Sequence, residues 1–294
     1  MTVKKKKGIA MLVAGVASLS ALVGGMFYGN TALRLNTYTV TSEKLPPSFD
    51  GYRIAHVSDL HNAQMGKNNE KLLTMLIDSK PDIIAITGDL VDSRNTDITV
   101  ALQFAQQAVK IAPCYYVSGN HEARISEYVT LKEALKKTGV TVLDDTGLEI
   151  ERCDNKIIIA GVDDPSFKTD YLFGDSATVM QNKLEKIITN NDTYTVLLSH
   201  RPELFEVYAD CGVDLALSGH AHGGQFRLPF IGGLLAPNQG LFPKYDSGQY
   251  TYKNTNMIVS RGIGNSLFPF RLFNRPEVIL IELKSNYSAD ANTK

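Results

Sequence analysis

The chain has 294 residues, a formal net charge of −1 and three cysteines, and these values exclude several classes of protein. The length suits a tether plus one large domain, or two small domains, and allows a sizeable core. A net charge near zero predicts no nucleic-acid partner, because nucleic-acid binders usually present a basic face. Cys114, Cys153 and Cys211 have no CxxC spacing, which argues against a zinc ribbon or a dense disulfide framework.

The N-terminal segment is apolar and long enough to cross a membrane. Residues 8–28 carry no charged side chain and follow a basic cluster, Lys4 to Lys7. As a helix they would span roughly 30 Å, the thickness of the hydrocarbon core of a bilayer. A cleaved signal peptide is the alternative, with Ser18-Leu19-Ser20 as a weak cleavage site, but the apolar run continues past it. We expect an uncleaved single-pass anchor, with the lysines in the cytoplasm and the remaining chain on the non-cytoplasmic side.

The chain divides into five predicted parts. We expect a basic cytoplasmic tail over residues 1–7, the anchor over 8–28, a linker over 29–49, one domain over 50–284 and a flexible tail over 285–294.

In the first half of the domain, apolar β-rich runs alternate with helical patterns, which indicates right-handed βαβ units on a parallel sheet. The predicted strands there are 53–57, 82–87 and 114–118, and the predicted helices are 69–79 and 97–111. The second half has predicted strands over 140–143, 148–152, 156–162, 194–199 and 213–218, a helix over 178–189, and strand-like segments from 225 to 283.

Polar residues gather just after the predicted strands, where ligands bind in open α/β sheets. The motifs are Asp59-Leu60-His61, Gly88-Asp89, Gly119-Asn120-His121-Glu122, Ser199-His200 and Gly219-His220-Ala221-His222. Five of the six histidines lie in these motifs. The sixth, His56, lies inside a predicted strand, and we interpret it as a core histidine.

Carboxylates, an amide oxygen and imidazoles, without thiolates, are ligands for hard-to-borderline divalent metals. Two metals close together need a bridging ligand, and an isolated carboxylate such as Asp89 can give one oxygen to each. Asp92 has two readings that the sequence leaves open: it could support the site from behind, or it could be a solvated residue at the start of a helix.

This ordered set of motifs resembles the signature of the calcineurin-like metallophosphoesterase superfamily over about residues 50–283. The ending 219–225, together with the anchor, is similar to the bacterial membrane-associated branch with YkuE-like and YaeI-like members. The resemblance implies an α/β fold in which two mixed β-sheets pack as a sandwich flanked by helices, preceded here by one transmembrane helix.

The resemblance also implies a binuclear metal centre and the role of each residue. One divalent ion would be held by Asp59, His61, Asp89 and His222, and the other by Asp89, Asn120, His200 and His220. His121 matches a histidine that is not a ligand and that faces the phosphate and its leaving group. Members of the family use manganese, iron or zinc, and the sequence does not choose among them.

The implied activity is hydrolysis of a phosphate monoester, diester or pyrophosphate by a hydroxide that two metals activate. The alternative is a non-catalytic metal-binding interaction module with the same fold, but such members typically lose ligands or His121, and here all are present. The anchor favours a lipid-linked or envelope substrate in a bacterial cell membrane. The substrate and the oligomeric state stay open.

Two late segments are apolar, and their role has two explanations. Residues 226–242 and 267–273 contain many large apolar side chains next to the last histidine motif. They are either core at strand ends or an exposed patch that touches lipid. In the second case Arg271 or Arg275 would contact a head-group phosphate.

Overall fold

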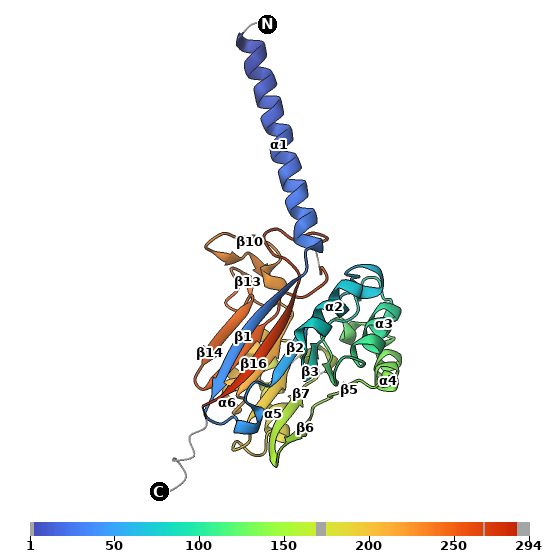
Figure 1. Ribbon diagram of the computed structural model, residues 1–294, viewed down its shortest axis with the longest axis vertical. Helices are drawn as coiled ribbons and strands as arrows, with labels where there is room; N and C mark the ends of the chain where they lie inside the picture. Colours follow the sequence, from blue (N-terminus) through green and yellow to red (C-terminus); the bar gives the residue numbers. More distant parts are fainter. Residues whose placement is uncertain (1–2, 169–174, 267, 287–294) are drawn as a thin grey trace.

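Helix α1 (Val3–Thr31) projects from one end of a body built on two β-sheets (Figure 1). The computed structural model describes residues 3–168, 175–266 and 268–286. The predicted flexible tail therefore lies outside the described residues beyond Asn286. Within α1, the stretch Met11–Thr31 is long and apolar enough to cross a membrane.

The first sheet has six strands in the order β1-β16-β2-β3-β4-β5. Strand β1 pairs parallel to β16, β16 pairs antiparallel to β2, and the remaining pairs are parallel. Helices α2 (Glu70–Ser79), α3 (Ile98–Ala108) and α4 (Tyr128–Thr138) pack against this half of the molecule. The strands are β1 (Arg34–Ser42), β2 (Arg53–Val57), β3 (Ile83–Thr87), β4 (Cys114–Val117), β5 (Thr141–Val142) and β16 (Glu277–Ser285).

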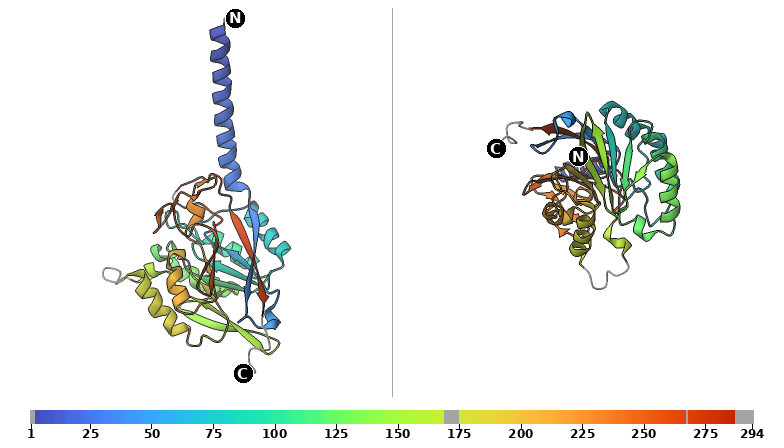
Figure 2. Two further views of the ribbon diagram at one scale, coloured as in Figure 1. Left: turned by 90° about the vertical axis from the view of Figure 1, so that its left-hand side faces the viewer. Right: turned by 90° about the horizontal axis from the view of Figure 1, so that it is seen from below.

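The second sheet also has six strands, in the order β14-β15-β9-β8-β7-β6. Helices α5 (Ser176–Ile187) and α6 (Phe205–Asp210) pack on it, and Figure 2 shows helices on the outer sides of both sheets. The strands are β6 (Thr146–Arg152), β7 (Asn155–Gly161), β8 (Thr195–Leu198), β9 (Leu215–Ser218), β14 (Gly248–Tyr252) and β15 (Thr255–Val259).

The inner faces of the two sheets share one apolar core. Ile54 and Ile281 from the first sheet pack in the same buried cluster as Val196 and Leu215 from the second. Burial on both faces explains why β2, β3, β8 and β9 appear in the sequence as continuous apolar runs. The prediction of two mixed sheets packed as a sandwich flanked by helices is confirmed.

The structure corrects the prediction of a linker over residues 29–49. Strand β1 lies inside that range and pairs with β16 through nine residue pairs, from Arg34–Glu277 to Ser42–Ser285. These residues therefore belong to the domain.

The sequence also missed α4 and α6, and it did not resolve the short hairpins between residues 227 and 241. Those hairpin strands are β10 (Arg227–Leu228), β11 (Gly232–Gly233), β12 (Leu235–Ala236) and β13 (Gly240–Leu241).

The direction of the strands places the polar motifs at the same end of the body as the foot of α1. Strand β1 starts three residues after α1 ends, so the foot marks the amino-terminal end of β1 and of its parallel neighbour β16. Because β2 runs antiparallel to β16, β2 and the parallel strands β3 and β4 end near the foot. The loops after these strands carry Asp59, Asp89 and Asn120.

Candidate metal centre

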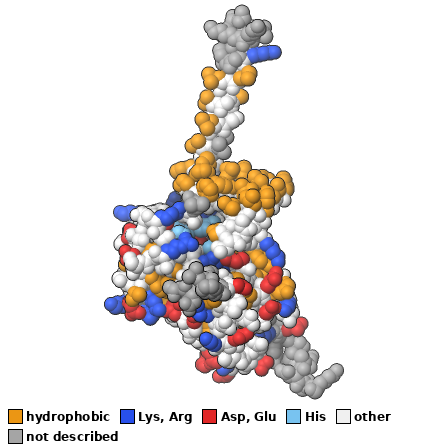
Figure 3. All heavy atoms as spheres, turned by 180° about the vertical axis from the view of Figure 1, so that it is seen from behind, with side chains coloured by type: hydrophobic (Ala, Val, Ile, Leu, Met, Phe, Trp, Pro, Cys, Tyr) orange, Lys and Arg blue, Asp and Glu red, His pale blue; other side chains and the backbone are white. Residues whose placement is uncertain are grey.

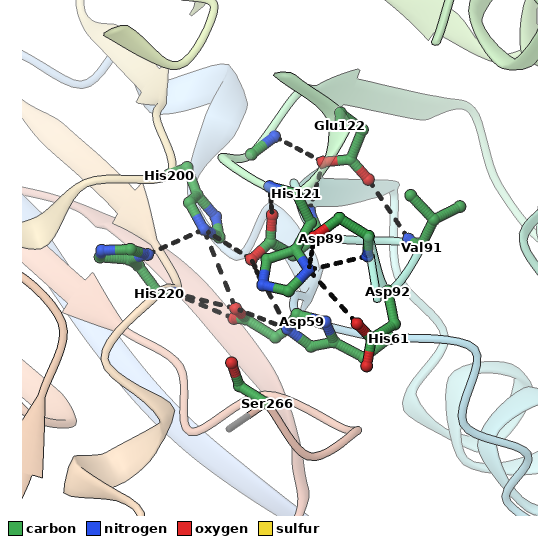
Figure 4. Close-up of polar contacts among 12 residues, drawn as sticks. Asp59, His61, Asp89, Val91, Asp92, His121, Glu122, His200, His220 and Ser266 are labelled. Atoms are coloured by element: carbon green, nitrogen blue, oxygen red, sulfur yellow. Dashed lines mark hydrogen bonds and ion pairs between the residues drawn. The ribbon is translucent and has the colours of Figure 1, made fainter. Parts of the chain in front are cut away.

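The structure brings together all seven side chains that the sequence predicted as metal ligands, and Figure 4 shows most of them. They follow β2, β3 and β4 in one sheet and β8 and β9 in the other, so both sheets contribute. All are buried, with exposed fractions of 0% (Asp59), 6% (His61), 1% (Asp89), 4% (Asn120), 0% (His200), 4% (His220) and 3% (His222).

Asp59, His61 and His222 form the first group of converging side chains. The Nε2 atoms of His61 and His222 lie 3.1 Å apart. Asp59 Oδ1 lies 3.3 Å from His222 Nε2 and 3.8 Å from His61 Nε2. Two ligands that each lie roughly 2.1 Å from one zinc-like cation are about 3–3.4 Å apart. Two of the three distances lie in this range and the third is longer, so the group leaves room for a cation between its side chains.

Asp89, His200 and His220 form the second group. His200 Nε2 lies 3.1 Å from Asp89 Oδ2 and 3.2 Å from His220 Nδ1. The same Asp89 Oδ2 lies 3.5 Å from His61 Nε2 in the first group. One carboxylate oxygen thus reaches both groups, which is the geometry that a bridging ligand requires.

Hydrogen-bond partners decide which ring nitrogen faces the site. His200 Nδ1 lies 2.7 Å from the carbonyl oxygen of Thr87 and donates there, so Nε2 is the ring nitrogen that faces Asp89. His220 Nε2 lies 3.0 Å from Asn238 Oδ1 and 3.2 Å from Arg201 Nη1, and these contacts leave Nδ1 facing His200. Partners of this kind hold imidazoles in the tautomer that binds a metal.

Asn120 supplies an independent test of whether a cation fits. Its amide oxygen Oδ1 is buried and has no hydrogen-bond partner among the described residues. Such an oxygen costs about 1–3 kcal/mol when it is left unsatisfied. Asn120 lines the same cleft as Asp89 and His220, so a cation in the second group would satisfy it. The residues present therefore fit two divalent ions.

The charge state of the groups also suits cation binding. Burial lowers the pKa of His222 to about 3, so this imidazole is neutral at pH 7. Burial raises the pKa of Asp59, but His222, His61 and His200 outweigh this effect and hold the pKa well below its usual value. Burial lowers the pKa of His200, whereas Asp89 reverses the direction and raises it to about 10. The ionised Asp89 carboxylate therefore attracts positive charge to the space beside His200. A proton on His200 supplies that charge here, and a bound cation would supply it instead.

Five ligand positions have a backbone conformation that side chains rarely adopt. The φ angles of Asp59, His61, Asp89, His220 and His222 lie between 44° and 67°. Left-handed backbone costs a non-glycine residue roughly 1–2 kcal/mol, and such strain accumulates at functional sites. The folded structure therefore holds these five residues in an unfavourable backbone conformation, in which their side chains converge.

Two glycines allow the ligand loops to approach one another. A Cβ atom on Gly119 would collide with Asp89 Oδ1, and a Cβ atom on Gly219 would collide with Asp59 Oδ2. Only glycine permits this approach without displacing a ligand.

Glu122 organises the centre, and the sequence analysis gave it no separate role. Its carboxylate accepts N–H groups from Asp89 (2.8 Å), Leu90 (2.8 Å), Val91 (3.3 Å) and Gly119 (2.7 Å). It is fully buried. Burial and the neighbouring Asp89 raise the pKa of Glu122 to about 7, while the N–H groups lower it. Glu122 thus ties the loop after β3 to the loop after β4.

Arg201 and Asp164 form a second support that the sequence analysis missed. Arg201 Nε and Nη2 donate to the two Asp164 oxygens at 2.6 and 2.8 Å. Arg201 Nη1 donates to Asn238 Oδ1 at 2.8 Å, the same oxygen that orients His220. Asp164 lies just after β7, so the rule that located the other motifs could have found it.

His121 faces the centre through Nε2, which lies 4.0 Å from Asp89 Oδ2. Its Nδ1 accepts the backbone N–H of Ser93 at 3.0 Å, so the proton of the neutral ring is on Nε2. Burial lowers the pKa of His121 to about 4. Asp92 lies behind the ring, 3.6 Å from Nδ1, and Arg94 holds it through two bonds of 2.9 and 2.6 Å.

The structure also tests the roles predicted for Asp92 and His56. The helix-start reading of Asp92 is wrong, because the residue that caps the N-terminus of α3 is Asp97. His56 is fully buried, and its Nε2 lies 2.7 Å from Thr87 Oγ1. It therefore lies in the core, as expected.

A cleft of about 200 Å³ is lined by Arg94, Arg124 and four of the predicted ligands, which are Asp89, Asn120, His220 and His222. A pocket of about 230 Å³ adjoins it, and both share His222, Pro237 and Ser266. The second pocket has a larger apolar share, with Leu235, Ala236 and Phe268 in its lining. The centre can therefore take a small anionic group beside an apolar one.

A two-sheet sandwich with Asp, Asn and His side chains after its strands is the architecture of a metallophosphoesterase. The sequence pattern of calcineurin-like phosphoesterases matches residues 52–224. The chain belongs to the calcineurin-like phosphoesterase family, and the resemblance noted from the motifs is confirmed.

Two relatives and one solved structure are similar to this chain. The uncharacterized metallophosphoesterase YkuE of Bacillus subtilis is 30% identical, over 92% of this chain and 94% of its own length. A transmembrane protein with a metallophosphoesterase domain from Danio rerio is 28% identical over 82% of this chain, which spans 55% of that protein. The crystal structure of TT1561 of Thermus thermophilus has a TM-score of 0.51 and 16% identity, over 72% of this chain and 90% of that one. This last likeness concerns the fold alone.

Proposed function

We propose that the protein is an enzyme that hydrolyses phosphate esters with two divalent cations. The position of Asp89 Oδ2 carries the proposal, since it lies 3.1 Å from His200 Nε2 and 3.5 Å from His61 Nε2. A carboxylate between two ligand groups is the arrangement of a two-cation centre. Asp59, His61, Asp89 and His222 would hold one ion, and Asp89, Asn120, His200 and His220 the other. Bound manganese, iron or zinc would neutralise phosphate oxygens and activate a water as the nucleophile.

His121 is the proposed hydrogen-bond donor to the phosphate or to its leaving oxygen. Because Ser93 N–H occupies Nδ1, the neutral ring can donate only from Nε2, which faces the cleft. A donor there stabilises charge on the phosphate or on the leaving oxygen. Arg94 is held in place by Asp92, so it can contact a further substrate oxygen at the rim.

The substrate is a monoester, a diester or a pyrophosphate, and we favour one that is lipid-linked or part of the cell envelope. The adjoining pocket supports this choice, because Leu235 and Phe268 offer an apolar group a place beside the metal cleft. The apolar helix α1 supports it as well, since it would keep the centre close to a membrane.

For the location we propose a bacterial cell membrane with the catalytic domain on its non-cytoplasmic side. The four lysines before the apolar stretch support this orientation. The orientation is tested by thiol labelling of a Cys211→Ser variant. Cys114 is buried and Cys153 is exposed, so Cys153 is the thiol that a reagent would reach in this variant. A maleimide that does not cross membranes should label intact cells; labelling only after lysis would reverse the orientation.

The activity is tested with the purified full-length protein, Mn²⁺ or Zn²⁺, and chromogenic monoesters and diesters. We expect hydrolysis that a chelator abolishes and added metal restores. The alternative function, a metal-binding interaction module, predicts bound metal without turnover on any of these esters or on lipid pyrophosphates.

A further inference from the structure

Large apolar side chains are exposed around the foot of α1, and we call this set the apolar collar. They come from the two short hairpins β10–β11 and β12–β13, their flanks, and the loop before β16. Figure 3 shows them as an orange band at the base of the helix, with histidines just beneath it on the same face. The collar consists of Leu228 (38% exposed), Phe230 (109%), Ile231 (65%), Leu241 (66%), Phe242 (58%) and Phe273 (67%).

The collar adjoins the apolar helix. Phe273 and Tyr28 line the same hollow of about 750 Å³, which also reaches Ser18 and Gly25 on α1. The stretch Met11–Thr31 is about 31 Å long at 1.5 Å per residue, so it fills a bilayer's hydrocarbon core. If α1 crosses a membrane, the collar lies at its surface.

The foot of α1 is attached to the body rather than joined by a free linker. Asn265 Nδ2 donates to Asn30 Oδ1 at 2.7 Å. Arg275 donates to the carbonyl oxygens of Ala32 (2.6 Å) and Leu33 (3.1 Å), and its guanidinium lies 5.1 Å from the centre of the Tyr28 ring. The foot of α1 is therefore bonded to the loop before β16, the loop that also carries Phe273.

The backbone of the collar gives a second indication. Phe230, Phe242 and Phe273 have φ angles of 67°, 55° and 51°. For bulky residues this conformation is unfavourable, and turns usually use glycine or asparagine there. The chain nevertheless exposes aromatic rings at these turns, where burial within the described residues gives no compensation.

Charge beside the collar suits a lipid head group. Arg34, Arg261 and Arg275 line the hollow, and Glu277 pairs with Arg34 at 3.1 Å. The sequence also offered Arg271 for a head group, but this was wrong. Arg271 is fully buried, and it donates to the Arg261 carbonyl oxygen at 2.8 Å.

We propose that the apolar collar inserts into the interfacial region of the bilayer that α1 crosses. It is a second membrane contact, and it goes beyond the proposed hydrolysis. Aromatic and aliphatic side chains next to cationic ones are typical of surfaces that lie in the head-group region. Two contacts fix the orientation of the domain, with the metal cleft facing the lipid surface.

The test uses fluorescence, because the chain contains no tryptophan. A Phe230→Trp variant of the full-length protein, placed in phosphatidylcholine–phosphatidylglycerol vesicles, carries one probe in the collar. The matched control is Ile77→Trp, at a 56% exposed position near the end of α2, which leads to the amino-terminal edge of β3, away from the foot. Quenching is measured with lipids brominated near the head group and with aqueous iodide.

The proposal predicts blue-shifted emission from position 230 that brominated lipid quenches strongly and iodide quenches weakly, with the reverse pattern at position 77. Equal iodide quenching at both positions would overturn it. Emission that shifts only as the number of proteins per vesicle rises would also overturn it, since a second copy would then cover the collar. No outcome depends on turnover, so failure here is distinct from failure of the proposed hydrolysis.

Discussion

The metal centre and the apolar collar lie at the same end of the molecule and are built in opposite ways. Both contain several non-glycine residues with positive φ, such as Asp89 in the centre and Phe230 in the collar. In the centre these residues are buried, and Glu122 fixes the backbone at Asp89. In the collar they are exposed. In the centre, contacts within the protein compensate for the backbone strain. In the collar, the compensation must come from a contact outside the protein.

The largest effect should come from Asp89→Ala, which removes the carboxylate between the two ligand groups. We expect hydrolysis to fall at least ~10³-fold and bound metal to fall more than in any other single ligand variant, because both ions lose a ligand. Elemental analysis and turnover on the same sample measure both effects. Asp210→Ala, at an exposed ion pair with Lys253, is the control. A variant that keeps two ions and normal turnover would refute the bridging role.

A smaller effect, roughly 10²-fold in kcat, is expected for His121→Ala. The ring donates from Nε2 and is not assigned as a ligand, so the metal content should stay at the wild-type level. The loss should be larger for esters with poor leaving groups, because these develop the most negative charge on the leaving oxygen. Loss of metal in this variant would instead make His121 a ligand.

Next in size is Glu122→Gln, which replaces a carboxylate that accepts four N–H groups. We expect the free energy of unfolding to fall by roughly 1.5–3 kcal/mol, since hydrogen bonds to a charged acceptor are lost or weakened. Chemical denaturation measures it. Glu133→Gln, at an exposed i,i+3 pair with Lys136, should change stability by less than about 0.5 kcal/mol. An equal, small effect in both variants would show that Glu122 does not hold the loops.

The smallest effect should be that of Phe230→Ser on stability in detergent, within about 0.5 kcal/mol, because the ring is exposed. Phe205→Ser provides the contrast. Phe205 is 1% exposed in the second sheet's core, and its loss should cost about 3–5 kcal/mol. If thermal or chemical unfolding showed a large loss for Phe230→Ser, the collar would be part of the core.

The sequence indicated which polar motifs lie together because their signals are local. Strands such as β3 are apolar runs, and polar motifs follow them directly. Parallel pairing then brings the carboxyl ends of the strands to one edge. Asp59 and Asp89 could therefore be associated without a structure, whereas His200 follows β8 in the second sheet and meets them only when the two sheets pack.

Other features depend on partners far away in sequence. Strand β1 is rich in polar residues, and its pairing with β16 joins Arg34 to Glu277, 243 residues apart. Nothing near residue 34 indicates that partner. The support of Asn238 by Arg201 is likewise visible only after folding.

The two apolar segments, residues 226–242 and 267–273, show a third limit of prediction from the sequence. Leu235 is half-buried and Leu241 is 66% exposed, although the sequence around them is similarly apolar. Composition cannot separate these cases, because a membrane and a protein core select the same side chains. Leu267, which the sequence placed in the second apolar segment, lies outside the described residues.

The central claim is that one centre holds two ions and uses them for hydrolysis. The most direct measurement is the number of metal ions per chain in the purified full-length protein, followed in the same sample by turnover of a phosphodiester during metal titration. The account predicts two ions per chain and turnover that rises as the second ion binds. One ion at saturation, or two ions without turnover on any phosphate ester, would contradict it.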